Sequence, residues 1–242
     1  MINPFRRWVF PEIEVWYHSH VPKEQYPFYD VLGREYSRRL EQGKLKAAYD
    51  WDDIVRTITR ETIGIHPPFT VKELVKKHAV PGKVWRFSDV LPTLNALRQA
   101  GARMVAATNG FECYQRPVTD SLQLTPFFSA FHTPDRLQTA KPSPDFFRFA
   151  APNRLIHVGD RIVQDVVGAN RVGAVSVWIN RDLPPEIQRL PLSRRKNHPD
   201  FHRFISTRLK WEGHSGDISE EHLPDYVLGS LEELLQVWEN RK

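Results

Sequence analysis

The chain has 242 residues, of which 40% are hydrophobic and 26% charged, and its net charge is +5. This composition is that of an ordinary globular protein, and the modest positive charge permits an acidic partner or a phosphorylated substrate without demanding nucleic acid. No apolar run approaches the roughly 20 residues that span a bilayer, so we expect no membrane association. The N-terminus lacks an apolar segment of secretory length, and the only cysteine, Cys113, excludes an internal disulfide. We therefore expect a cytoplasmic protein, with an organelle left open.

The N-terminal part of the chain combines a short apolar run with a long helical pattern. Residues 7–10 (Arg-Trp-Val-Phe) are predicted as a first strand that Pro11 ends. Residues 12–17 alternate polar and apolar side chains, as a continuing strand would. From Tyr26 to about His78 the apolar residues follow helical spacing. This block is expected to form an all-helical unit.

After Pro81 strands alternate with helices, which predicts a parallel, doubly wound α/β sheet. Ser88 or Asp89 is expected to cap the first of these helices, which Gly101 ends. The predicted strands are 103–107, 127–131, 155–159, 174–179 and 225–228, and the predicted helices are 88–101, 113–122, 145–150 and 163–172.

Polar side chains follow three of the predicted strands, at the edge where open α/β sheets bind their ligands. They are Thr108 with Asn109, Lys141 before a helix, and Asp160 with Asp165. A hydroxyl and an amide can hold phosphate oxygens, a lysine neutralises a phosphate, and two carboxylates suit Mg²⁺. Each group also has a structural explanation: Thr-Asn-Gly forms a turn, a lysine is solvated, and the aspartates cap a helix or fill a turn.

These motifs resemble those of the haloacid dehalogenase-like hydrolases with a helical cap. The family's second motif, an apolar strand ending in Thr or Ser, is similar to Met104–Thr108, and its third, a lysine commonly followed by proline, to Lys141-Pro142. Its fourth motif, Gly-Asp with a second Asp five positions on, is similar to Gly159-Asp160 with Asp165. The family consists mostly of Mg²⁺-dependent phosphatases with a Rossmann-like core and, in this subgroup, a helical cap inserted after the first strand.

The resemblance implies a domain layout and a set of site residues. Residues 1–16 and 85–242 would form the α/β core, and residues 17–84 the helical cap. Asp160 and Asp165 would bind Mg²⁺, and Thr108, Asn109 and Lys141 would hold the phosphate of a small phosphorylated molecule, with Lys141 also steadying the intermediate.

The family's first motif is Asp-x-Asp at the end of strand one, where the first Asp attacks phosphorus and the second moves a proton. An ungapped match places Pro11 and Ile13 at these two positions, and neither can do this chemistry. A shift of one residue offers Glu12 and Glu14, whose extra methylene displaces the carboxylate oxygen. Two hypotheses follow: a catalytically impaired relative that acts through binding or assembly, or a phosphohydrolase that uses a displaced glutamate.

Residues 184–223 form a long insertion before the closing strand. It is rich in Arg, Lys and His, with Phe201, Phe204 and Trp211 interleaved. Basic residues mixed with aromatic ones suit an acidic protein surface or RNA, which would contact residues 189–211. The alternative is a segment whose aromatic side chains pack it against the core.

Overall fold

The computed structural model describes residues 3–149, 151 and 155–240, and the chain divides into two compact units. Unit 1 consists of Met1–Phe87 and Arg103–Ala140, and unit 2 of Ser88–Ala102 and Lys141–Lys242. Each unit is thus built from two separate stretches of the chain. In this division the N-terminal residues and residues 103–140 are grouped with the helical block. The predicted end of a helix at Ala150 lies outside the described residues.

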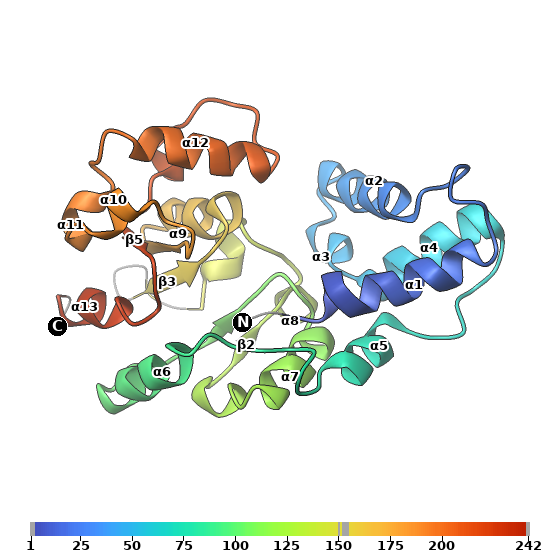
Figure 1. Cartoon of the computed structure of the whole chain (residues 1–242), viewed down its shortest axis with the longest axis horizontal. Helices are drawn as coiled ribbons and strands as arrows, with labels where there is room; N and C mark the ends of the chain where they lie inside the picture. Colours follow the sequence, from blue (N-terminus) through green and yellow to red (C-terminus); the bar gives the residue numbers. More distant parts are fainter. Residues whose placement is uncertain (1–2, 150, 152–154, 241–242) are drawn as a thin grey trace. The chain divides into compact units, whose positions relative to one another are not determined.

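Unit 1 is mainly helical, and its helices α1 to α5 run from blue to cyan in Figure 1. The backbone N–H of Asp53 donates to the Asp50 carboxylate at 3.0 Å, which caps α4. Thr70 and Glu73 form a reciprocal capping box at the start of α5. The helical prediction for residues 26–78 is confirmed. The helices of unit 1 are η1 (Phe5–Val9), α1 (Phe10–His18), α2 (Phe28–Glu41), α3 (Leu45–Ala48), α4 (Trp51–Ile63), α5 (Val71–His78), α7 (Glu112–Ser121), η2 (Thr125–Phe127) and α8 (Pro134–Leu137).

The predicted first strand at residues 7–10 is wrong, because this segment lies within η1 and α1. Val9, Ile13 and Tyr17 are each 0% exposed. A buried residue at every fourth position is the signature of a helix with one apolar face. Of the alternating apolar residues predicted to form a strand, Ile13 and Tyr17 lie on the buried face of this helix, whereas Val15 is 75% exposed.

Two short strands complete unit 1. β1 (Ala106–Ala107) pairs in parallel with β2 (Phe131–His132), with Ala106 opposite Phe131. Both strands are shorter than predicted, and the segment expected to start the second one forms the turn η2. Among the described residues, no strand precedes β1.

Unit 2 contains a three-stranded parallel sheet with the order β3-β4-β5. Its middle strand is almost entirely apolar and buried, as expected for a parallel strand covered on both faces. The parallel pairing confirms the predicted α/β class. The elements of unit 2 are α6 (Val90–Gln99), η3 (Pro144–Phe147), β3 (Ile156–Gly159), η5 (Ile162–Val166), α9 (Val167–Arg171), β4 (Val175–Ile179), α10 (Pro185–Gln188), α11 (Leu192–Arg195), α12 (Phe201–Trp211), η6 (Glu220–His222), β5 (Tyr226–Leu228) and α13 (Leu234–Glu239).

The N-terminal stretch of unit 2 is attached to the rest of that unit through α6. This helix packs against α13. Asp89 occupies the cap position before α6, but its carboxylate makes no cap hydrogen bond there. Instead it accepts from the Arg181 guanidinium at 3.0 Å and from the backbone N–H of Leu231 at 2.7 Å. Asp89, which was predicted as a helix cap, therefore connects distant parts of unit 2.

None of the described helices is long and apolar enough to cross a membrane.

Candidate functional site

The acidic loop, residues 159–165, begins with the last residue of β3 and includes most of η5. β3 pairs with β4 over its whole length, so the loop starts from a fixed strand. The Trp178 indole Nε1 donates to the Asp160 carbonyl oxygen at 3.2 Å. The neighbouring strand β4 therefore helps to hold the loop in place, in addition to β3, from which the loop starts.

Asp165 is the centre of a buried charge cluster in unit 2. Its Oδ1 accepts from Lys141 Nζ at 2.6 Å and from His157 Nε2 at 2.8 Å, and its Oδ2 accepts from the Arg161 backbone N–H at 3.0 Å. All three side chains are buried. The structure therefore brings together the predicted Lys141 and Asp165. The structure also adds His157 to this cluster. This residue was not predicted from the sequence, where its only signal was a polar side chain inside an apolar strand.

The cluster shifts two pKa values downward. Burial would raise the pKa of Asp165, but the Lys141 charge and the hydrogen bonds from His157 and Lys141 outweigh it and hold that pKa well below its usual range. Burial lowers the pKa of His157, and the hydrogen bond to Asp165 offsets this only in part. Since the carboxylate only accepts, the His157 Nε2 carries a proton in this hydrogen bond.

Gly159 is required by this packing. A Cβ at this position would lie 2.0 Å from Asp165 Cγ, closer than any real carbon contact. The Gly-Asp pair of the motif is therefore explained by close approach to the Asp165 carboxylate.

Asp160 lies in a different environment from Asp165. It is exposed, whereas both Asp165 oxygens are engaged by Lys141, His157 and the loop backbone. Within residues 3–149, 151 and 155–240, no three His, Cys, Asp or Glu side chains are grouped as metal ligands. Mg²⁺ is usually held by one or two carboxylates and by water, so of the expected pair the exposed Asp160 suits this ion, whereas both Asp165 oxygens are already engaged.

The predicted phosphate-binding residues of unit 1 follow β1. The Gly110 backbone N–H donates to the Thr108 hydroxyl at 3.1 Å, and the Asn109 amide Nδ2 donates to the Tyr49 hydroxyl at 2.8 Å. Asn109 is buried beneath Tyr49, at the end of α3, so it ties this loop to the helices of unit 1. Thr108 and Asn109 belong to unit 1 and Lys141 to unit 2.

Glu12 and Glu14 lie on α1 rather than at a strand end. The Glu12 carboxylate accepts from Lys77 Nζ and from His78 Nε2, both at 2.7 Å. The Lys77 hydrogen bond is the main reason that the pKa of Glu12 lies below its usual value. Pro11 and Ile13 share this helix, with Ile13 fully buried. The match of residues 11 and 13 to a strand-end motif is therefore wrong, and Glu12 is used as an ion-pair partner.

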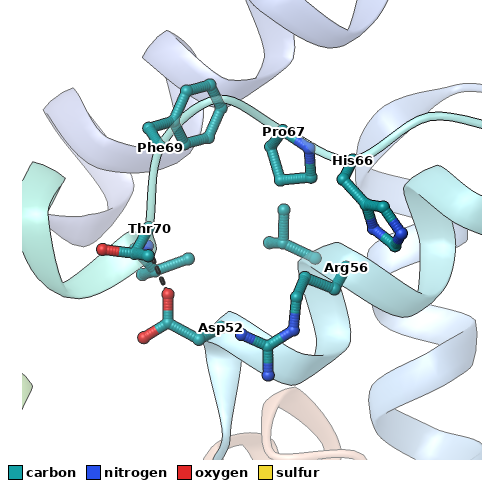
Figure 2. Close-up of a pocket in the computed structure, with 8 residues that line it drawn as sticks. Asp52, Arg56, His66, Pro67, Phe69 and Thr70 are labelled. Atoms are coloured by element: carbon teal, nitrogen blue, oxygen red, sulfur yellow. Dashed lines mark hydrogen bonds between the residues drawn. The ribbon is translucent and has the colours of Figure 1, made fainter.

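The Asp-x-Asp spacing at Asp50–Asp52 lies beside a small pocket in unit 1, shown in Figure 2. The Asp52 carboxylate accepts from the Val71 backbone N–H and from the Tyr114 hydroxyl. The pocket has a volume of about 100 Å³. Small-molecule sites usually exceed about 300 Å³, so this pocket does not suit a phosphorylated metabolite.

The basic insertion is largely packed into unit 2. Phe201 is fully buried, and Phe204 packs partly buried against the same core cluster. Arg195 is also buried, and its guanidinium donates to both oxygens of Glu233 at 2.6 and 2.8 Å. Of the three interleaved aromatic side chains only Trp211 is exposed, at 60%. The alternative of an insertion tucked against the core by its aromatics is correct for Phe201 and Phe204.

The family match covers the same region of the chain as the three motifs. Residues 84–173 match the haloacid dehalogenase-like hydrolase family. The glyceraldehyde 3-phosphate phosphatase of Methanopyrus kandleri is 36% identical over 101 residues, which is 39% of this chain and 43% of that protein. The matched region thus spans less than half of this relative.

Solved structures match over nearly the whole chain. The HAD phosphatase from Thermococcus onnurineus has a TM-score of 0.59 at 23% identity, covering 95% of this chain and 91% of that one. The HAD-hydrolase YfnB from Bacillus subtilis, solved bound to magnesium, has a TM-score of 0.55 at 16% identity, covering 95% and 92%. These likenesses show a shared fold. Residues 84–173, which carry the three motifs, are thus similar to the haloacid dehalogenase-like hydrolase family.

Proposed function

We propose that this chain is a member of the phosphatase lineage that acts by binding and does not hydrolyse phosphate esters with its own residues. The observation that carries the proposal is the position of Glu12. It lies on α1, paired with Lys77 and His78, rather than at the end of a strand. A carboxylate whose two oxygens are both engaged by hydrogen-bond donors is less available as a nucleophile.

A small phosphorylated molecule is the proposed ligand. The relative named glyceraldehyde 3-phosphate phosphatase supports this class. Within unit 1, the Thr108 hydroxyl is the group proposed to contact a phosphate, with Asn109 holding the Thr108 loop through Tyr49. Within unit 2, the proposed group is Lys141. Lys141 is bonded to Asp165, so phosphate binding would have to compete with, or share, that ammonium group.

The second candidate is an active Mg²⁺-dependent phosphohydrolase acting on a small phosphorylated metabolite through Glu12 or Glu14. The name of the Methanopyrus relative and the magnesium bound to the Bacillus structure favour it. Asp160 would then be the exposed carboxylate that contacts the ion.

Turnover of a generic aryl phosphate with Mg²⁺ separates the two candidates. We expect no turnover above the rate without protein, for the wild type as for Glu12→Gln. Glu24→Gln is the matched control, because Glu24 is exposed and close to α1 in the sequence. Clear wild-type turnover that Glu12→Gln abolishes and Glu24→Gln leaves intact would establish the active enzyme. Calorimetric titration with Mg²⁺, comparing wild type with Asp160→Asn, tests the ion separately.

We also propose an acidic protein surface as a partner of residues 189–211. Arg189, Arg194 and Lys196 are exposed there, which suits an acidic partner. RNA fits less well, because Phe201 and Phe204 are packed inward and Trp211 already has two guanidinium groups over its ring. Double charge reversal at Arg194 and Lys196 should weaken binding to a poly-glutamate probe. Tighter binding to single-stranded RNA than to that probe at equal salt would favour RNA instead.

The cytoplasm remains the proposed compartment, on the strength of the single cysteine.

A further inference from the structure

The helix α12 of the insertion packs directly on η5, most of which lies in the acidic loop. Phe201, Ile205 and Leu209 form its buried face at four-residue spacing. They belong to one cluster with Ile162 and Val166 of η5 and with Trp178. The insertion and the acidic loop therefore share a hydrophobic core.

Glu212, the residue that follows α12, contacts the loop backbone. Its side chain is 0% exposed. One carboxylate oxygen accepts from the Ile162 backbone N–H at 3.0 Å and the other from the Val163 backbone N–H at 2.9 Å. The first N–H groups of a helix have no partner within the helix, so this carboxylate satisfies two of them at once.

Two arginines surround the Glu212 carboxylate. Arg161 Nε and Arg208 Nε each lie 3.5 Å from one of its oxygens. Arg208 also donates to the Asp160 carbonyl oxygen at 3.4 Å, and both guanidinium groups lie over the Trp211 ring, at 5.0 and 4.2 Å. Burying a carboxylate is costly unless it is paired and hydrogen-bonded, and here both conditions are met.

We infer that the insertion 184–223 is a clamp on the acidic loop and that Glu212 is its positioning residue. Glu212 fixes the backbone at Ile162 and Val163, while Arg208 and Trp178 fix the carbonyl of Asp160. Together these contacts set the direction in which the Asp160 carboxylate leaves the loop. The inference goes beyond the proposed function, because it holds whether or not the chain turns over a phosphate ester.

Site-resolved amide hydrogen exchange on the full chain, without ligand, tests the clamp. In Glu212→Ala we expect the Ile162 and Val163 amides to exchange at least about tenfold faster, because both lose a charged acceptor. Glu212→Gln keeps the shape and one acceptor oxygen, so it should restore part of the protection. The control is Glu220→Gln, since Glu220 is an exposed acid of the same insertion.

The amides of β4 distinguish positioning from general packing. They should change less than about twofold in either Glu212 variant. Unchanged exchange at Ile162 and Val163 would overturn the clamp, and so would equal acceleration across β4 and the loop. If Glu212→Ala does not fold, the isosteric Glu212→Gln variant still decides between these outcomes. Because no substrate is present, failure of the clamp and failure of the proposed function are read separately.

Discussion

At the scale of single residues, the charge cluster around Asp165 depends on a glycine. Because a Cβ at residue 159 would overlap Asp165 Cγ, Gly159→Ala must displace the carboxylate from Lys141 and His157. Breaking a buried ion pair costs about 3–5 kcal/mol, so we expect a loss of that order in the unfolding free energy measured with urea.

The matched control for this substitution is Gly33→Ala. Gly33 lies inside α2, and nothing is within 4 Å of the position of a new Cβ. Since alanine favours a helix over glycine, it should raise the unfolding free energy by about 1 kcal/mol. A loss of less than about 1 kcal/mol for Gly159→Ala would contradict the close contact with Asp165.

His157 makes stability depend on pH. Its folded pKa is lowered, so below about pH 6.5 the unfolded chain takes up a proton that the folded chain does not. Stability therefore falls as the pH drops below that value, by at most about 1.4 kcal/mol per pH unit for this group. Asp165, whose folded pKa is also lowered, contributes stability above about pH 4, and this is lost as the pH falls further.

Urea unfolding at pH 7.5 and 5.5 measures the histidine contribution. His157→Gln should show a smaller loss between the two pH values than the wild type, because glutamine does not titrate. The exposed His66 provides the comparison, and His66→Gln should lose as much as the wild type. Equal losses in all three proteins would assign the pH dependence to other groups.

At the scale of secondary-structure elements, the insertion is fastened by one buried arginine. Arg195, at the end of α11, donates hydrogen bonds to the Glu233 carboxylate and to the backbone carbonyls of Gln188, Leu190 and Val227. Its neighbour Arg194 is exposed. Arg195→Ala leaves these acceptors without their donor and should cost about 3–5 kcal/mol. Arg194→Ala should change the unfolding free energy by less than about 0.5 kcal/mol. Thermal and urea unfolding of both variants gives the comparison, and similar values would show that the pair with Glu233 adds little.

The elements also show what the sequence could and could not predict. The alternation after Pro81 predicted the parallel α/β class, and the three motifs predicted the family whose model matches residues 84–173. The N-terminal strand was wrong because a four-residue apolar run is ambiguous between strand and helix. The spacing of Val9, Ile13 and Tyr17 carried the helical signal.

The partners of individual charges could not be predicted. Lys141 and Asp165 are 24 positions apart, and only the sheet and its crossover bring them together. The inward direction of Arg195 and Phe201 likewise depends on packing against Glu233 and Trp178, which no local pattern encodes.

At the scale of the whole molecule, each unit is assembled from two stretches of chain, and Asp89 joins those of unit 2. It connects the start of α6 to Arg181 and to Leu231. Asp89→Ala removes two charged hydrogen bonds and should lower the unfolding free energy by about 2 kcal/mol. The control is Asp182→Ala, since Asp182 is exposed. A chemical denaturation curve unchanged by Asp89→Ala would mean that apolar packing alone holds α6 in place.

Because each unit is built from two separate stretches of chain, parts of one unit are synthesised well before the parts they pack against. α6 leaves the ribosome long before α13, its packing partner, and at about 5–20 residues per second the delay is on the order of ten seconds or more. During that time α6, whose Leu94 and Leu97 are buried in the finished protein, lacks α13 as a packing partner. The nascent chain therefore presents an amphipathic helix suited to transient capture by a chaperone, and slowing translation downstream of Gln99 should lengthen that exposure.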